Sequence, residues 1–235
     1  MDREIKVSAS ILCADFSRLK DEIKKCEDAG VDMIHIDVMD GHFVPVITIG
    51  ALIVEAIRPL TKLIIDTHLM VDHPSDHIDP FMKAGSDIIS IHAECYGKRP
   101  PNCREYGQFP KTVKAIDAEV VRQDIRRIHQ KGKKAFMVFN PTTPLCLGTL
   151  VNDVDGVLIM SVDPGYSGQK FKPVGLAKIE QLREVFDGDI SIDGGVNAET
   201  APKAVKAGAN ILATASYFFR SADPKKAVEY LKSLK

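Results

Sequence analysis

The chain has 235 residues, 45% hydrophobic and 27% charged, which excludes a largely disordered protein and permits a sizeable hydrophobic core. Its 31 basic and 32 acidic side chains give a net charge of −1, which argues against nucleic acid or an anionic membrane surface as the main partner. No apolar run approaches the roughly 18 residues of a membrane span, and no signal-peptide pattern follows Met1. Together with five scattered cysteines, these features predict a cytoplasmic protein.

Short apolar runs alternate with longer amphipathic stretches along the whole chain. They predict eight strands, which begin near Ile5, Val31, Leu63, Asp87, Lys134, Gly156, Ile190 and Asn210. The clearest helical patterns lie between the strands, at residues 16–29, 118–130, 175–186, 198–207 and 224–234. Capping residues mark the starts of three of these helices, namely Asp15 or Ser17, Asn197 and Asp223.

Eight strand–helix units in a chain of this length predict a (β/α)8 TIM barrel that occupies residues 1–235 as a single domain. An open, doubly wound sheet is the alternative, but it has fewer strands and a glycine fingerprint after its first strand, which this sequence lacks. Residues 96–115 are rich in proline and glycine and predict an elongated loop after the fourth strand. This loop is either a lid or interface element, or a surface insertion.

Polar side chains occupy one face of the second predicted strand. Because side chains alternate along a strand, His35 and Asp37 share one face, and Ile34, Ile36 and Val38 share the other. The apolar face is expected to meet the helices, which turns the polar face toward the interior of the barrel. Burying these polar groups without a partner is costly, so they require a metal, another polar group or a substrate.

Two later strands repeat this pattern. Asp66 and His68 share a face of the third strand, and Asp193 ends the seventh. If the three strands enter one barrel, two imidazoles and two carboxylates converge at its top, a set that suits zinc, iron, manganese or cobalt: His35, Asp37, His68 and Asp193. Taken singly, each residue has another interpretation, because strand histidines are often hydrogen-bonded core residues and strand-end aspartates often cap the next helix.

Glycine-rich or small-residue turns follow the last three predicted strands, around residues 163–171, 193–195 and 214–216. In (β/α)8 barrels, the loops after the late strands expose backbone N–H groups that bind phosphate, and glycine permits a close approach of the ligand. Ordinary strand–helix turns are the alternative. Three such turns in neighbouring units favour a barrel of the phosphate-binding type.

Six segments resemble the ribulose-phosphate 3-epimerase family, in order and over nearly the whole chain. They are SASIL at 8–12, HIDVMDGHFVP at 35–45, HLMVDHP at 68–74, NPTTPL at 140–145, VDPGYSGQKF at 162–171 and DGGV at 193–196. The second segment is long and highly specific. The region around residues 96–115 is the one part of the chain without this resemblance.

The resemblance implies an enzyme with one divalent metal ion (Zn, Fe, Mn or Co) and no nucleotide cofactor. The implied metal ligands are His35, Asp37, His68 and Asp193, and the implied catalytic acid/base pair is Asp37 and Asp193. Substrate contacts carried over from the family are Ser10, His35, Met39, His68 and Met70, with Met137 or Met160 beside them. The implied phosphate site comprises Gly165, Tyr166, Ser167, Gly168, Gly194, Gly195, Ala215 and Ser216.

The implied reaction is epimerisation at C3 of a ketose phosphate by two-base proton transfer through an enediolate. D-ribulose 5-phosphate to D-xylulose 5-phosphate is the leading conversion, and another ketose phosphate such as D-allulose 6-phosphate is the alternative. The expected partners are the small-molecule substrate and further copies of the chain, in a dimer or hexamer, with neither nucleic acid nor membrane.

Four positions depart from the family pattern, so the exact substrate stays open. Val46 stands where the family has asparagine, Ala51 replaces a proline, Ser167 falls within a Gly-Gly pair, and Ala215 replaces a glycine. Two other functions are weighed. A lyase or decarboxylase of the same fold needs an inward lysine, which the central strand positions lack. A non-catalytic sugar-phosphate-binding barrel has no need of two opposed carboxylates.

Overall fold

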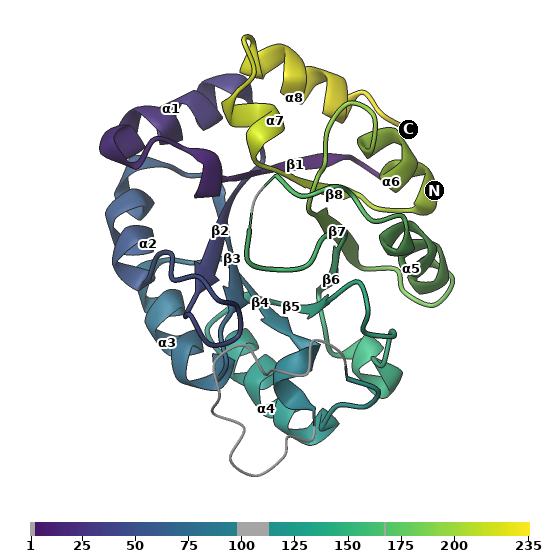
Figure 1. The fold of residues 1–235 in the computed structure, drawn as a ribbon. Helices are drawn as coiled ribbons and strands as arrows, with labels where there is room; N and C mark the ends of the chain where they lie inside the picture. The colour runs from purple at the N-terminus through teal and green to yellow at the C-terminus, as the bar shows by residue number, and fades with distance from the viewer. Residues whose placement is uncertain (1–2, 98–112, 167) are drawn as a thin grey trace.

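Eight parallel strands close into a barrel that is surrounded by helices (Figure 1). The computed structural model describes residues 3–97, 113–166 and 168–235. Its strands are β1 (Lys6–Ser10), β2 (Met33–Met39), β3 (Ile64–Met70), β4 (Ile88–His92), β5 (Lys134–Phe139), β6 (Gly156–Met160), β7 (Asp189–Asp193) and β8 (Ile211–Thr214). Each strand pairs with the next, and β8 pairs with β1. The prediction of a (β/α)8 barrel is therefore confirmed.

The helices follow the strands, most of them after a short 3-10 turn or loop. They are α1 (Leu19–Ala29), α2 (Ala51–Ile57), α3 (Pro74–Ala84), α4 (Ala118–His129), α5 (Val174–Arg183), α6 (Ala201–Ala207), α7 (Ser216–Phe219) and α8 (Pro224–Lys232). The 3-10 turns are η1 (Ile11–Cys13), η2 (Phe16–Arg18), η3 (Arg58–Leu60), η4 (Ala93–Tyr96) and η5 (Gly148–Asn152).

The predicted start of α6 at residue 198 is wrong, because α6 begins at Ala201. Asn197 does accept hydrogen bonds from the backbone N–H groups of Glu199 and Thr200, at 2.8 and 3.1 Å. Its side chain therefore closes a turn rather than capping the helix directly. Asp15 and Asp223 cap their elements as expected.

Strand alternation explains both layers of the core. Ile34, Ile36 and Val38 pack outward in the shell between strands and helices, while His35 and Asp37 turn into the barrel. The same alternation corrects one prediction, which placed Met137 on β5 among the candidate substrate contacts.

Phe136 and Val138 belong to interior clusters, so Met137, which lies between them, packs outward in the helix-facing core. Met137 therefore does not line the interior, whereas Met160 does.

Apolar side chains fill the lower part of the barrel. Met33, Ile88, Phe136 and Ile211 form a buried cluster there. Gly156 makes room for the ring of Phe136, because a Cβ atom at this position would lie 2.3 Å from its Cζ atom. The interior is thus packed below, and the polar side chains collect at the carboxyl ends of the strands.

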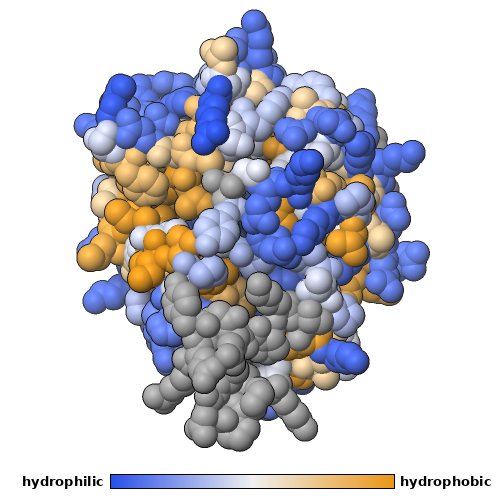
Figure 2. All heavy atoms as spheres, in the orientation of Figure 1, coloured by the Kyte–Doolittle hydropathy of each residue, from blue (hydrophilic) through white to orange (hydrophobic). Residues whose placement is uncertain are grey.

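Hydrophobic side chains also gather on the outer surface, over the connection from β2 to α2 and over α2 itself (Figure 2). Ile47 and Leu52 lie in this segment, and each is 79% exposed. No helix in the described ranges has the length and apolar character needed to cross a membrane. Most of the predicted loop at residues 96–115 lies outside the described residues.

Candidate metal and active site

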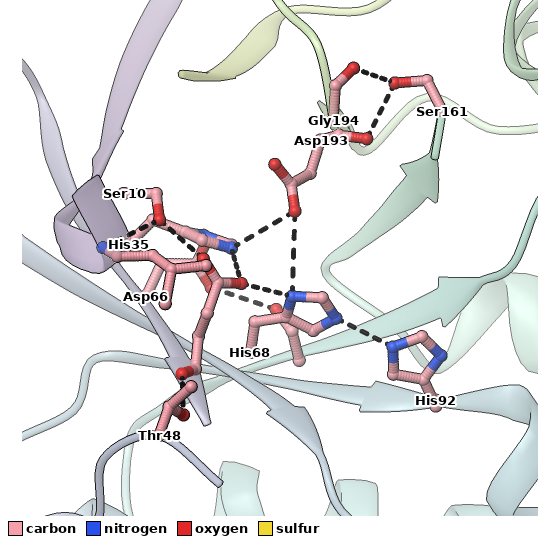
Figure 3. Close-up of polar contacts among 12 residues, drawn as sticks. Ser10, His35, Thr48, Asp66, His68, His92, Ser161, Asp193 and Gly194 are labelled. Carbon is pink, nitrogen blue, oxygen red and sulfur yellow. Dashed lines mark hydrogen bonds and ion pairs between the residues drawn. The ribbon is translucent and has the colours of Figure 1, made fainter. Parts of the chain in front are cut away.

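Four side chains from three strands converge at the top of the barrel, as the alternation predicts (Figure 3). Asp37 on β2 lies in register with His68 on β3, and His35 lies two residues before Asp37 on the same face. Asp193 enters from β7. One potential ligand atom from each of the four lies within 4.8 Å of all the others.

Asp37 lies at the centre of this group. Its Oδ1 atom is 3.2 Å from His35 Nε2 and 3.0 Å from His68 Nδ1. The Oδ2 atom of Asp193 is 3.9 Å from each of the same two nitrogens. The second oxygen of Asp37 accepts a hydrogen bond of 2.6 Å from the Ser10 hydroxyl, which fixes the carboxylate plane.

His35 shows that the group fits a cation. Its Nδ1 atom lies 2.8 Å from a carboxylate oxygen of Asp66, which requires the hydrogen on Nδ1 when the imidazole is neutral. Its Nε2 atom is buried and makes no hydrogen bond to any described residue, although it points at the carboxylates of Asp37 and Asp193. In the neutral imidazole this Nε2 atom has a lone pair that faces the two carboxylates, and with a second imidazole beside it the group is a donor set that suits a divalent transition metal.

The surroundings of the two carboxyl groups separate their pKa values. Burial raises the pKa of Asp37, but the positive charge of His35 and the close polar contacts with His35 and His68 outweigh it, so this pKa lies well below its ordinary value. Burial and the negative charge of Asp37 raise the pKa of Asp193 from 3.8 to about 7. Without a bound cation and below about pH 7, the site therefore offers one ionised and one protonated carboxyl group.

The two histidines also differ. Burial lowers the pKa of His35, but the charges of Asp37 and Asp66 outweigh it and raise this pKa well above its ordinary value. Burial lowers the pKa of His68 to about 4, and the neighbouring His92 adds to the shift. The imidazole of His68 is therefore neutral near pH 7 and has a lone pair available for a cation.

A cavity of about 410 Å³ opens directly above this group. Asp37 and Asp193 form part of its floor, whereas His35 and His68 lie beneath the floor rather than in the lining. Other predicted substrate contacts lie in the lining: Ser10, Met39, Met70, Met160, Gly165, Tyr166, Gly168, Gly194, Gly195, Ala215 and Ser216. Ser167 lies outside the described residues.

The far side of the cavity is built by the loops after β6, β7 and β8. Gly194 and Gly195 have φ angles of +106° and +64°, and a Cβ atom on Gly194 would lie 2.5 Å from Val162 Cγ2. Ala215 has a φ of −116°, outside the left-handed region that favours glycine, so its backbone does not require the glycine expected from the family pattern. Arg220, which follows α7, also lines the cavity.

Val46, another expected departure from the family pattern, lies next to the apolar wall of the cavity. It packs against a buried cluster of Met39, Val44 and Met70, of which the two methionines line the cavity. The valine adds apolar contact to this cluster.

Sequence reasoning missed several residues that support the site. The Ser161 hydroxyl donates to the backbone carbonyls of Asp193 and Gly194 and so holds the end of β7. His92 received no predicted role, yet its Nε2 atom lies 2.8 Å from that of His68. The sequence contained a signal for this role. Ser90 and His92 alternate on the inward face of β4, as His35 and Asp37 do on β2, and Glu94 follows two residues later.

Comparison with known proteins shows to which family the chain belongs. A model of the ribulose-phosphate 3-epimerase family matches residues 6–219. The chain belongs to this family. A ribulose-phosphate 3-epimerase from Bacillus subtilis is 44% identical over 98% of this chain and 100% of its own length. One from Methanocaldococcus jannaschii is 42% identical over 97% of this chain and 90% of its own length.

A plant protein is also similar to this chain. The chloroplastic ribulose-5-phosphate-3-epimerase of Arabidopsis thaliana is 41% identical over 99% of this chain and 78% of its own length. Among solved structures, 3-hexulose-6-phosphate synthase from Salmonella typhimurium matches with a TM-score of 0.66 and 16% identity, and the match covers 97% of each chain. At that identity, the likeness shows the barrel fold alone.

Proposed function

We propose that this member of the ribulose-phosphate 3-epimerase family inverts C3 of a ketose phosphate and converts D-ribulose 5-phosphate to D-xylulose 5-phosphate. One observation carries the proposal. Asp37 and Asp193 reach the floor of one cavity from β2 and β7, so two carboxyl groups from different strands can act on one bound substrate. Inversion next to a carbonyl needs a base on one face of the carbon and an acid on the other.

In this mechanism, ionised Asp37 removes the C3 proton and protonated Asp193 returns a proton to the opposite face; the reverse reaction exchanges the roles. The Ser10 hydroxyl holds Asp37 in place through its hydrogen bond of 2.6 Å. Met39, Met70 and Met160 cover the reacting carbons with apolar, polarizable side chains that donate no protons. These side chains therefore cannot protonate the enediolate at the wrong position.

His35, Asp37, His68 and Asp193 would hold one divalent metal ion, of zinc, iron, manganese or cobalt. When bound, the ion supplies positive charge next to the developing oxyanion. The backbone N–H groups of Gly165, Gly168, Gly194, Gly195 and Ala215, with Tyr166 and Ser216, would bind the substrate phosphate, and we assign Ser167 to the same site by its place in the sequence.

We further propose that residues 1–235 act as one domain, that the protein is cytoplasmic, and that it forms a homo-oligomer, a dimer or hexamer. The exposed Ile47 and Leu52 supply apolar surface for contact between copies. The thiols of Cys13, Cys26 and Cys146 form no disulfide with described residues, which suits a reducing compartment.

Deuterium exchange tests the reaction and identifies the substrate. Metal-loaded protein is incubated in D2O with a panel of ketose phosphates that includes ribulose 5-phosphate and allulose 6-phosphate, and deuterium at C3 is followed. We expect epimerisation of ribulose 5-phosphate, with one deuterium incorporated at C3 of the product. No exchange with any member of the panel, while metal binding is verified, would refute the proposed function.

A further inference from the structure

A chain of buried polar side chains extends from His68 away from the cavity. The Nε2 atoms of His68 and His92 lie 2.8 Å apart, and the Nδ1 atom of His92 lies 2.9 Å from Glu94 Oε2 (Figure 3 shows the two histidines). The rings of His68 and His92 are stacked, with centroids 5.0 Å apart. All three side chains are at most 1% exposed, and neither His92 nor Glu94 lines the cavity.

Glu94 is firmly held at the end of this chain. Its Oε1 atom accepts a 2.9 Å hydrogen bond from the backbone N–H of Asn140, and the Thr143 side chain also bonds to it. The buried Lys178 ammonium binds the backbone carbonyls of Asn140 and Thr143 and so fixes the same loop. Burial raises the pKa of Glu94, but hydrogen bonds, led by that from His92, outweigh it and lower this pKa. Glu94 is therefore an ionised carboxylate.

The carboxylate favours one direction for the hydrogen bonds in the chain. A carboxylate only accepts hydrogen bonds, so His92 carries a hydrogen on Nδ1. The Nε2 atom of His92 can then accept a hydrogen from Nε2 of His68. In that arrangement His68 Nδ1, which lies 3.0 Å from Asp37 Oδ1, has its lone pair available for a cation.

We propose that Glu94, acting through His92, fixes His68 in the Nε2–H tautomer and so presents its Nδ1 lone pair to the metal site. Asp66 does the same for His35 directly, through its bond to Nδ1. Both residues of the chain are positioning residues, because they act on the site through His68. This inference rests on the proposed function, since His68 is one of the proposed metal ligands.

Glu94→Gln tests the direction of the hydrogen bonds with little change of shape. The backbone N–H of Asn140 holds the amide oxygen, so the amide nitrogen of the new side chain faces His92 Nδ1 and donates to it. Each bond along the chain then reverses, and the hydrogen of His68 moves to Nδ1, where it competes with a metal ion. Removing the partner of a ligating histidine costs about 10–100-fold in metal affinity.

The measurement is the Kd of the full-length protein for Zn²⁺. A chelator first removes bound metal, and the protein is then titrated with Zn²⁺ in competition with a chromophoric chelator. We expect Glu94→Gln to raise this Kd about 10–100-fold. Asp124→Asn is the matched control, because Asp124 is also a buried carboxylate but bonds to Ser75 and Tyr96 instead of a histidine. The control should keep the wild-type Kd.

A second readout needs no variant. In the ¹⁵N spectrum of the Zn²⁺-loaded wild-type protein, the hydrogen of His68 should reside on Nε2. A hydrogen on Nδ1 would overturn the proposal, as would an unchanged Kd in Glu94→Gln or an equal loss in the Asp124→Asn control. Failure of the wild-type protein itself to bind metal is a different result, because it would refute the proposed metal site rather than the hydrogen-bond chain alone.

Discussion

Replacing Asp193 with asparagine should separate catalysis from stability. The Asp193→Asn side chain keeps the size of the original but can neither accept nor return a proton. The loss of a positioned acid/base group costs about 10²–10⁴-fold in rate, and the loss of a candidate metal ligand adds to it. We therefore expect turnover to fall by at least that factor, while the metal-free protein stays folded.

The same change should stabilise the metal-free fold at alkaline pH. Between about pH 4 and pH 7, the folded chain keeps a proton on Asp193 that the unfolded chain has released, because burial and Asp37 raise this pKa from 3.8 to about 7. Wild-type stability therefore decreases as pH rises through this window. A shift of about three pKa units corresponds to about 4 kcal/mol, which is the largest gain that the neutral amide can give above pH 7.

Urea unfolding in the presence of a chelator measures this gain. At pH 8, the free energy of unfolding of Asp193→Asn should exceed that of wild type, and the difference should shrink toward zero at pH 4. Excess divalent metal should reverse the order, because a ligand that binds only the folded state stabilises wild type more. Equal stabilities at pH 8, or near-normal turnover of the variant, would show that our account of Asp193 is wrong.

Two further variants test the phosphate end of the cavity. Arg220 is the only lysine or arginine among the described residues that line the cavity, and it is exposed, so Arg220→Gln should cost about 1 kcal/mol of substrate binding. Steady-state kinetics should show this as a roughly fivefold higher KM with little change in kcat; an unchanged KM would exclude a role in binding. Gly194→Ala should lower stability by about 1–3 kcal/mol, because its φ is +106° and its Cβ would meet Val162. Thermal unfolding of both variants measures this cost. Gly132→Ala, at a φ of +67° with open space around it, should lose less stability than Gly194→Ala, and equal losses would contradict the steric argument.

Alternation along the strands made much of the site predictable from the sequence. The residues His35, Asp37, His68 and Asp193 each lie on the expected inward face, because one-sided apolar patterns determine which face of a strand meets the helices. The closed barrel followed from eight strand–helix units, and closure through β8 and β1 brings β7 within three strands of β2. Periodicity and topology therefore determined both the fold and the convergence of these four side chains.

Contacts between neighbouring strands were harder to predict. The link from His68 to His92 depends on the register of β3 with β4 and on the short turn η4, neither of which periodicity defines. Met137 was misplaced as a candidate because its residue type drew attention, although its neighbour Phe136 shows that it faces outward. The start of α6 was wrong because Asn197 can close a turn as well as cap a helix.

The order of the four metal-site residues along the chain has a consequence for biosynthesis. His35, Asp37 and His68 lie on β2 and β3, whereas Asp193 ends β7, and β8 must then pair with β1. A nascent chain that has emerged only through β6 therefore offers three of the four ligating groups. Because chains emerge from the N-terminus first, the full set of four proposed ligands and the last barrel seam form at the same late stage, and we expect newly made protein to reach its full metal affinity only as it finishes folding.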